Sequence, residues 1–169
     1  MKTTAELATR SGTVVTVRPA TEADAAALSA FFDQVSDDDR RFRFFTAGER
    51  VSTEQLEPLI NADEFSSESF LAFDKANDEL IGSALLACDA RLDTGEVAVS
   101  IRKDYKGKGV GWALLDFLGE RAQKLGVRRV IAIESRENHA AIELEREKGF
   151  TPESFDDDPT LVILSKTFR

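Results

Sequence analysis

The stretch "DYKGKGVGWALLDF" (Asp104–Phe117) joins a bare, positively charged loop to an apolar run with helical spacing. Three glycines and two lysines lie within residues 106–111. The first amides of a helix have no partner inside the helix and carry the positive end of its dipole, so they attract anions. Glycines would let a phosphate approach those amides closely. The stretch is therefore either a loop that binds a pyrophosphate or a flexible surface loop without a ligand.

Two well-known phosphate-binding motifs do not fit this loop. The ATP-type loop requires Lys and Ser or Thr after its last glycine, but Trp112 and Ala113 follow Gly111. The dinucleotide fingerprint G-x-G-x-x-G fails as well, because its last glycine would fall on Trp112 or Leu114. What remains is a K-x-x-G-x-G pattern over residues 106–111, placed between a strand pattern and a helix pattern.

The segments around the loop alternate between strand and helix patterns. We expect strands near residues 13–20, 69–74, 80–89, 96–102, 128–135 and 161–168, the last of them in a hairpin across 151–159. Helices are expected over residues 21–35, from near 52, between the glycine loop and Gly126, and between Asn138 and Gly149. This order predicts an α/β fold with one mixed sheet and helices on both faces. We expect a single domain over residues 13–169, preceded by a flexible N-terminal arm over residues 1–12.

Composition narrows the class of protein. The 169 residues are 42% hydrophobic and 31% charged, as in an ordinary globular protein, with no apolar run long enough to cross a membrane. One cysteine excludes an internal disulfide, and the absence of an export signal makes the cytoplasm the expected location. A net charge of −9 argues against nucleic acid and is compatible with a cationic partner, although acidity also serves solubility.

No metal site is expected. The two "DDD" runs, residues 37–39 and 156–158, read as loops whose adjacent carboxylates point in different directions, unlike a ligand cage. We interpret both as solvated, and the first as able to help attract a cationic acceptor. The arginines of "RFRFF" (residues 41–45) are expected in salt bridges or facing an acceptor cleft.

Residues 95–150, "GEVAVSIRKDYKGKGVGWALLDFLGERAQKLGVRRVIAIESRENHAAIELEREKGF", resemble the Gcn5-related N-acetyltransferase (GNAT) family. The strand "VAVSI", the glycine loop, an apolar strand some twenty residues later and the final helix agree in order and spacing. The resemblance implies a central mixed, mostly antiparallel sheet of six or seven strands. It also implies acetyl-CoA as co-substrate and direct acetyl transfer to a primary amine.

The segment "VRPATEADAAALSAFFDQVSDDDRRFRFF" (residues 17–45) resembles the start of the acetyltransferase domain in bacterial protein lysine acetyltransferases, which act on acyl-CoA synthetases. This resemblance implies a protein lysine as acceptor. A small amine, polyamine or amino acid is the alternative acceptor, and a non-catalytic acetyl-CoA-binding module is the alternative class. The chain is expected to be a monomer or a homodimer.

The resemblance also assigns cofactor-binding positions. Backbone groups of Val99, Ser100 and Ile101 would bind the pantetheine arm and polarise the thioester carbonyl. The residues that would bind the pyrophosphate or lie around it are Lys106, Gly107, Lys108, Gly109, Val110, Gly111 and Trp112. Asn138 matches an asparagine that contacts the cofactor near its pantetheine, while its alternative role is that of a plain helix N-cap.

Glu96 is the expected general base. An amine with a pKa of ~10.4 is protonated at neutral pH and must lose a proton before it attacks. A carboxylate whose pKa is raised by burial can accept that proton directly or through water. The alternative is a solvated glutamate ending the turn "DTGE".

No general acid is assigned. Glu145 stands where the family frequently has a tyrosine that protonates the departing thiolate. The single tyrosine, Tyr105, is expected to pack beside the glycine loop, and water can protonate the thiolate instead.

Overall fold

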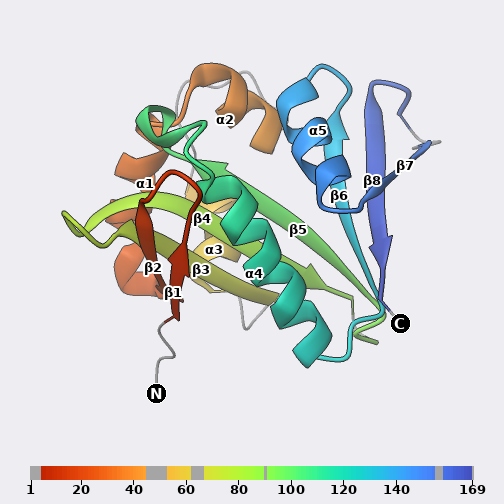
Figure 1. Cartoon of the computed structure of the whole chain (residues 1–169), viewed down its shortest axis with the longest axis horizontal. Coiled ribbons are helices and arrows are strands. Elements are labelled where there is room, and N and C mark those ends of the chain that lie inside the picture. Colours follow the sequence, from red (N-terminus) through yellow and green to blue (C-terminus); the bar gives the residue numbers. More distant parts are fainter. Residues whose placement is uncertain (1–4, 45–52, 62–66, 90, 155–157, 169) are drawn as a thin grey trace.

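The computed structural model describes residues 5–44, 53–61, 67–89, 91–154 and 158–168 (Figure 1). Its centre is an eight-stranded sheet with the strand order β1-β2-β3-β4-β5-β6-β8-β7. All neighbouring strands are antiparallel except β5 and β6, which are parallel. The strands are β1 (Ala5–Ala8), β2 (Val14–Pro19), β3 (Ser67–Asp74), β4 (Glu79–Cys88), β5 (Thr94–Ile101), β6 (Arg129–Ser135), β7 (Thr151–Ser154) and β8 (Leu161–Thr167).

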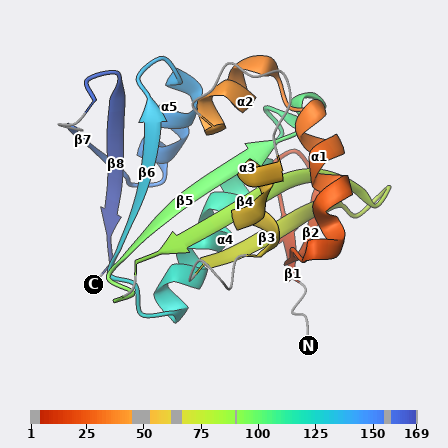
Figure 2. The ribbon, with the colours of Figure 1, turned by 180° about the vertical axis from the view of Figure 1, so that it is seen from behind.

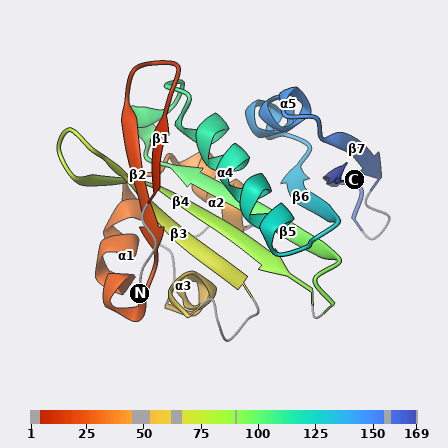
Figure 3. The ribbon, with the colours of Figure 1, turned by 60° about the horizontal axis from the view of Figure 1, so that its bottom comes forward.

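Helices lie on both faces of the sheet, as the sequence predicts (Figures 2 and 3). They are η1 (Glu22–Asp24), α1 (Ala25–Asp33), α2 (Asp37–Phe44), α3 (Thr53–Ile60), η3 (Lys103–Tyr105), α4 (Val110–Lys124) and α5 (His139–Glu147). Helices α1 and α3 cover one face, and α4 and α5 lie on the other. Helix α2 lies near one end of the sheet, between α1 and α5 (Figure 1).

Two hydrophobic clusters fix the helices to the sheet. Leu28 of α1, Leu59 of α3 and Leu71 of β3 are buried together on one face. Ala72, the next residue after Leu71, is buried in the other cluster with Leu114 of α4. Because successive strand residues point to opposite faces, both faces of the central strands must be apolar. This explains the nearly continuous apolar runs of β3 and β4.

The prediction of a flexible arm over residues 1–12 is wrong for Ala5–Ala8. The expected count of six or seven strands is wrong as a result. Ala5–Ala8 pairs antiparallel with β2 as strand β1 and makes the sheet eight-stranded. Ala5 and Leu7 pack against the core, while Glu6 and Ala8 are exposed. Four residues give only two periods of this alternation, which is too short a pattern to distinguish a strand from an arm.

The acidic run at residues 37–39 does not lie in a loop, as the sequence predicted, but forms the first turn of α2. The Ser36 hydroxyl accepts a hydrogen bond from the Asp39 amide at 3.2 Å, which is a helix N-cap contact. Carboxylates in a first helical turn are stabilised by the helix dipole. The Ser-Asp-Asp-Asp sequence is thus a helix start. Asp156 and Asp157 of the second run lie outside the described residues.

A partly buried ion pair at the start of α1 makes stability depend on pH. Arg18 donates to both carboxylate oxygens of Asp24 at 2.8 and 2.9 Å, and the Thr21 amide donates to the same carboxylate at 2.8 Å. The hydrogen bonds from Arg18 are the main cause that lowers the pKa of Asp24 to about 2. A carboxyl whose pKa is lower in the folded state stabilises the fold above its unfolded pKa, and this contribution is lost as the pH falls through the folded pKa.

We therefore expect Asp24→Asn to reduce the free energy of unfolding by about 2 kcal/mol near neutral pH. The gap to wild type should shrink as the pH falls from about 4 toward about 2, as measured by urea unfolding. Glu6→Gln is the control, because Glu6 and Lys75 form an ion pair with both side chains more than half exposed, at 55% and 57%. A difference in unfolding free energy between Asp24→Asn and wild type that stays constant over this pH range would contradict an ionic origin of the stabilisation.

Candidate active site

The site begins where β5 and β6 separate. The two strands pair only over Thr94–Glu96 and Arg129–Ile131, and then diverge (Figures 1 and 2). Beyond Glu96, β5 stays paired to β4 as far as Ile101, and β6 stays paired to β8 as far as Ser135. The two facing edges therefore have backbone donors and acceptors available to a ligand. The predicted positions Val99, Ser100 and Ile101 lie on this open edge of β5.

A cavity of about 480 Å³ occupies the gap. Its walls include Leu85, which belongs to the cluster beneath α1 and α3, and Leu115, which belongs to the cluster beneath α4. The cavity thus connects the two faces of the sheet through the fork between β5 and β6. Two ligands can enter such a cavity from opposite faces and meet in the middle.

The glycine loop forms one end of this cavity. Helix α4 begins after Gly109, which has φ +82°. Because glycine has no side chain, the N-cap residue makes no hydrogen bond to the first amides of the helix. Gly111 lines the cavity, and a Cβ on it would lie 3.4 Å from Cδ2 of Leu144 on α5. A larger residue would press on α5 there. The structure is that of a helix N-terminus open to an anion.

Lys106 lines the same cavity and reaches across it. Its Nζ donates to Oδ2 of Asp39 on α2 at 2.5 Å. Asp39 also lines the cavity, so the acidic run contributes one carboxylate to the site. An anionic ligand at the loop would compete with Asp39 for the lysine.

The other predicted loop residues do not line the cavity, namely Gly107, Lys108, Gly109, Val110 and Trp112. Val110 is buried in the core. Trp112 is half-buried, with Nζ of Lys148 4.1 Å and Cζ of Arg10 5.5 Å from its ring centre. The roles predicted for these residues in cofactor binding stay predictions.

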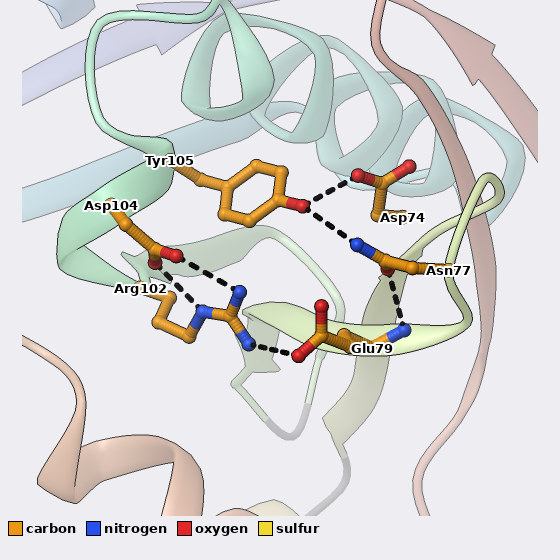
Figure 4. Close-up of polar contacts among 6 residues, drawn as sticks. All are labelled: Asp74, Asn77, Glu79, Arg102, Asp104 and Tyr105. Carbon is orange, nitrogen blue, oxygen red and sulfur yellow. Dashed lines mark hydrogen bonds and ion pairs between the residues drawn. The ribbon is translucent and has the colours of Figure 1, made fainter.

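Tyr105 packs beside the loop, as expected, and is held by a polar network (Figure 4). Its hydroxyl donates to Asp74 at 2.5 Å and accepts from Asn77 at 3.2 Å. The hydrogen bond with Asp74 raises the pKa of Tyr105 and lowers the pKa of Asp74. Arg102 donates to Asp104 at 2.7 and 3.0 Å. The network ties η3 to the turn between β3 and β4, so it fixes the start of the glycine loop.

Glu96 lies where the pairing of β5 with β6 ends. Its neighbour Val97 is buried beneath α4, so Glu96 points to the opposite face of the sheet. The side chain is exposed because the cavity is open, but the cavity walls still remove part of its water. This desolvation raises the pKa of Glu96, Arg43 of α2 opposes the shift, and Glu134 adds to it. A carboxylate with a raised pKa at this point is suited to accept a proton.

Asn138 and Glu134 meet at the far wall of the cavity. The side-chain oxygen of Asn138 accepts from the Ala141 amide at 3.4 Å, so the N-cap interpretation is confirmed. Its amide nitrogen lies 3.5 Å from Oε1 of Glu134 on β6. Sequence reasoning missed Glu134, because residues 128–135 are expected only as an apolar strand. A charged residue at the end of such a strand, four residues before an N-cap, was the available signal.

Arg43 is half-buried and lines the cavity from α2. Burial lowers the pKa of its guanidinium, while Glu96 and Glu134 raise it. The expectation that an arginine of this segment faces the cleft is confirmed for Arg43.

Within the described residues, the structure contains neither a cluster of metal ligands nor a membrane-spanning helix. No group of three or more His, Cys, Asp or Glu side chains there is arranged to hold a metal ion. No helix in those ranges is long and apolar enough to cross a membrane.

Comparison with known proteins places the chain in a family. Residues 32–150 match the model of the acetyltransferase (GNAT) family. Acetyltransferase PA5475 of Pseudomonas aeruginosa is 30% identical over 154 residues, which cover 90% of this chain and 83% of that protein. The chain therefore belongs to the GNAT family of acetyltransferases, and the fold class predicted from the sequence is confirmed.

Solved structures agree with this assignment. The GNAT domain of S. lividans PAT is 26% identical, with a TM-score of 0.87 and coverage of 98% of this chain and 97% of that one. The spermidine N-acetyltransferase of Vibrio cholerae, solved with CoA and spermine, shares the fold at 19% identity, with a TM-score of 0.69 and coverage of 89% and 92%.

Proposed function

We propose that this acetyltransferase moves the acetyl group of acetyl-CoA directly to the side-chain amine of a protein lysine. The observation that carries the proposal is the cavity through the fork between β5 and β6, with Glu96 at the point where the strands separate. Such a cavity admits a thioester from one face and an amine from the other. Cytoplasmic location and oligomeric state stay predictions.

The α4 side of the cavity fits the cofactor. Amides at the start of α4 and the Lys106 ammonium would hold the pyrophosphate. The small Gly111 leaves the space between α4 and α5 open. Backbone groups of Val99–Ile101, which have no partner on β6, would bind the pantetheine arm and polarise the thioester carbonyl.

Glu96 would prepare the acceptor. Its carboxylate takes a proton from the acceptor ammonium, directly or through water, and the neutral amine attacks the carbonyl carbon. The new C–N bond forms as the C–S bond breaks, without a covalent bond to the enzyme. Holding both reactants in one cavity supplies proximity and orientation.

Charge in the cavity favours a cationic acceptor. Its walls carry the acidic residues Asp39, Glu96 and Glu134 against the basic residues Arg43 and Lys106. A lysine and a polyamine both satisfy this condition. The protein lysine is preferred because residues 17–45 resemble the start of the acetyltransferase domain in protein lysine acetyltransferases.

The test is acetyl-CoA turnover against purified acyl-CoA synthetases, lysine peptides, spermidine and free amino acids, with mass spectrometry of each product. We expect acetylated lysine on a protein and no acetyl-enzyme in the intact mass when the acceptor is left out. Preferential acetylation of spermidine would identify a polyamine, and not a protein lysine, as the acceptor. Binding of acetyl-CoA without transfer to any acceptor would support the non-catalytic module instead.

The Tyr105 network gives a separate prediction about cofactor affinity. Tyr105→Phe leaves Asp74, which is 8% exposed, without its strongest partner and frees the start of the glycine loop. Loss of a hydrogen bond of about 1 kcal/mol should raise the Kd of CoA about fivefold, as measured by calorimetry. Glu79→Gln is the control, because its 3.5 Å contact with Arg102 is exposed. Equal Kd values for Tyr105→Phe and wild type would contradict the tethering role.

A further inference from the structure

A second cavity, of about 210 Å³, lies next to the first on the α4 face of the sheet. Its walls come from α4, β5, β6 and β8, and from the segment that follows α5. Val97 of β5 and Leu115 of α4 line both cavities. Both residues are almost fully buried, at 4% and 6% exposure, and belong to the cluster beneath α4. Val97 and Leu115 therefore form the wall between the two cavities.

The two cavities follow one another along α4 and along β5. On α4, Gly111 lines only the first cavity, Leu115 lines both, and Gly119 lines only the second. On β5, the first cavity extends from Ile101 to Val97, and the second cavity also reaches Val97. On both elements, the second cavity lies on the side of the wall away from the glycine loop.

The facing side of the cleft shows the same order. Glu134 of β6 lines only the first cavity, and Val130, nearer the start of that strand, lines only the second. Leu144 of α5 lines only the first cavity, and Lys148, just after the helix, lines only the second. The second cavity is thus a continuation of the first along the direction of α4.

The proposed function directs the acyl group at the wall. The pyrophosphate would lie at the start of α4 and the pantetheine arm along Val99–Ile101, so the thioester is the part of the cofactor farther from the glycine loop. An acyl group on that thioester is then directed towards Val97 and Leu115. An acetyl group has only one carbon beyond its carbonyl, whereas each further methylene would press on the wall.

We propose that Leu115 limits the length of the acyl group that this enzyme transfers, and that the second cavity is an acyl-chain site that Leu115 closes. The inference rests on the proposed function. Extra methylenes in a packed site force side chains out of their preferred rotamers, so the closed wall disfavours longer chains. The bonds that change are those of acetyl transfer. The amine loses its proton to Glu96, the C–N bond forms and the C–S bond breaks.

The lining of the second cavity suits an unbranched, uncharged acyl chain. Val130 and Phe150 give it buried apolar surface, on which methylene groups are stabilised because they leave water. Asp116 and Lys148 also line it, but they neutralise one another in an ion pair at 2.5 Å. A Cβ added to Gly119 would meet nothing within 4 Å, so the space beside α4 is open there.

The decisive variant is Leu115→Ala, which removes most of the wall on the α4 side. We expect the ratio of kcat/KM for hexanoyl-CoA to kcat/KM for acetyl-CoA to rise about 10-fold or more over wild type. Leu118→Ala is the matched control. It makes the same truncation at a buried position of the same helix, but Leu118 lines neither cavity. Its ratio should equal that of wild type.

A binding measurement without an acceptor tests the site itself. By calorimetry, Leu115→Ala should bind hexanoyl-CoA about 10-fold more tightly than wild type does. Adding Gly119→Leu should reverse this gain, because the new side chain would occupy the second cavity. Leucine favours a helix more than glycine does, so this change should not unfold α4. Val97→Ala opens the same wall from β5 and replaces Leu115→Ala if that variant does not fold.

Two results would overturn the role of Leu115. One is a wild-type enzyme that uses hexanoyl-CoA as well as acetyl-CoA. The other is a folded Leu115→Ala or Val97→Ala variant whose preference and affinity for hexanoyl-CoA equal those of wild type. A wild-type protein that transfers no acetyl group to any acceptor would contradict the proposed function instead. The calorimetric comparison would still decide whether Leu115 closes an acyl-chain site.

Discussion

Replacing Glu96 by glutamine is expected to lower kcat by about 10²- to 10³-fold while the affinity for acetyl-CoA stays unchanged. Glutamine has the shape of glutamate but cannot accept a proton from the acceptor ammonium. Glu96 lies at the fork and points away from the α4 side where the cofactor would bind. The measurements are steady-state kinetics with the identified acceptor and calorimetric titration with CoA.

The pH dependence tests the same role. The active form of Glu96 is the ionised one. Desolvation by the cavity walls raises its pKa, so the fall of kcat/KM with decreasing pH should begin at a higher pH than for an ordinary glutamate. This acidic limb should be missing in Glu96→Gln. Glu147→Gln, on the exposed side of α5, should behave as wild type. A Glu96→Gln variant with wild-type kcat would exclude Glu96 as the base.

Gly109→Glu is expected to raise the Kd of CoA by about 100-fold or more. Gly109 precedes α4 at φ +82°, and a Cβ there would lie 2.9 Å from Cγ of Arg10. The new carboxylate would lie at the helix N-terminus that we assign to the pyrophosphate, where like charges cost several kcal/mol. Fluorescence or calorimetric titration with CoA measures the effect.

Gly126→Glu separates this charge effect from backbone strain. Gly126 follows the other end of α4 with the same φ of +82°, and nothing lies within 4 Å of a Cβ there. Both variants should lose about 1–2 kcal/mol of stability from the left-handed backbone. The affinity for CoA should fall only in Gly109→Glu. Undiminished affinity in that variant would remove the glycine loop from the cofactor site.

Local patterns predicted most of the elements. The strand before the loop, α4 with its closing Gly126, and α5 between Asn138 and Gly149 lie close to where the sequence places them. These elements are signalled by caps, by glycines at positive φ and by apolar periodicity, all of which act within a few residues. Strand β1 and helix α2 were missed. Four residues are too few to show a period, and an acidic run reads as a loop until its N-cap is recognised.

The sequence by itself determined the glycine loop before α4, because a left-handed backbone and a bare helix start depend on nearby residues alone. Only the tertiary structure decided which residues share the cavity. It brings Glu134 of β6, Arg43 of α2 and Glu145 of α5 together around the fork, although 91 residues separate the first two along the chain. It also sets the protonation of each glutamate. The same side chain is exposed at Glu96 and buried beside a second carboxyl at Glu145, and ionisation depends on this solvation and charge rather than on residue type.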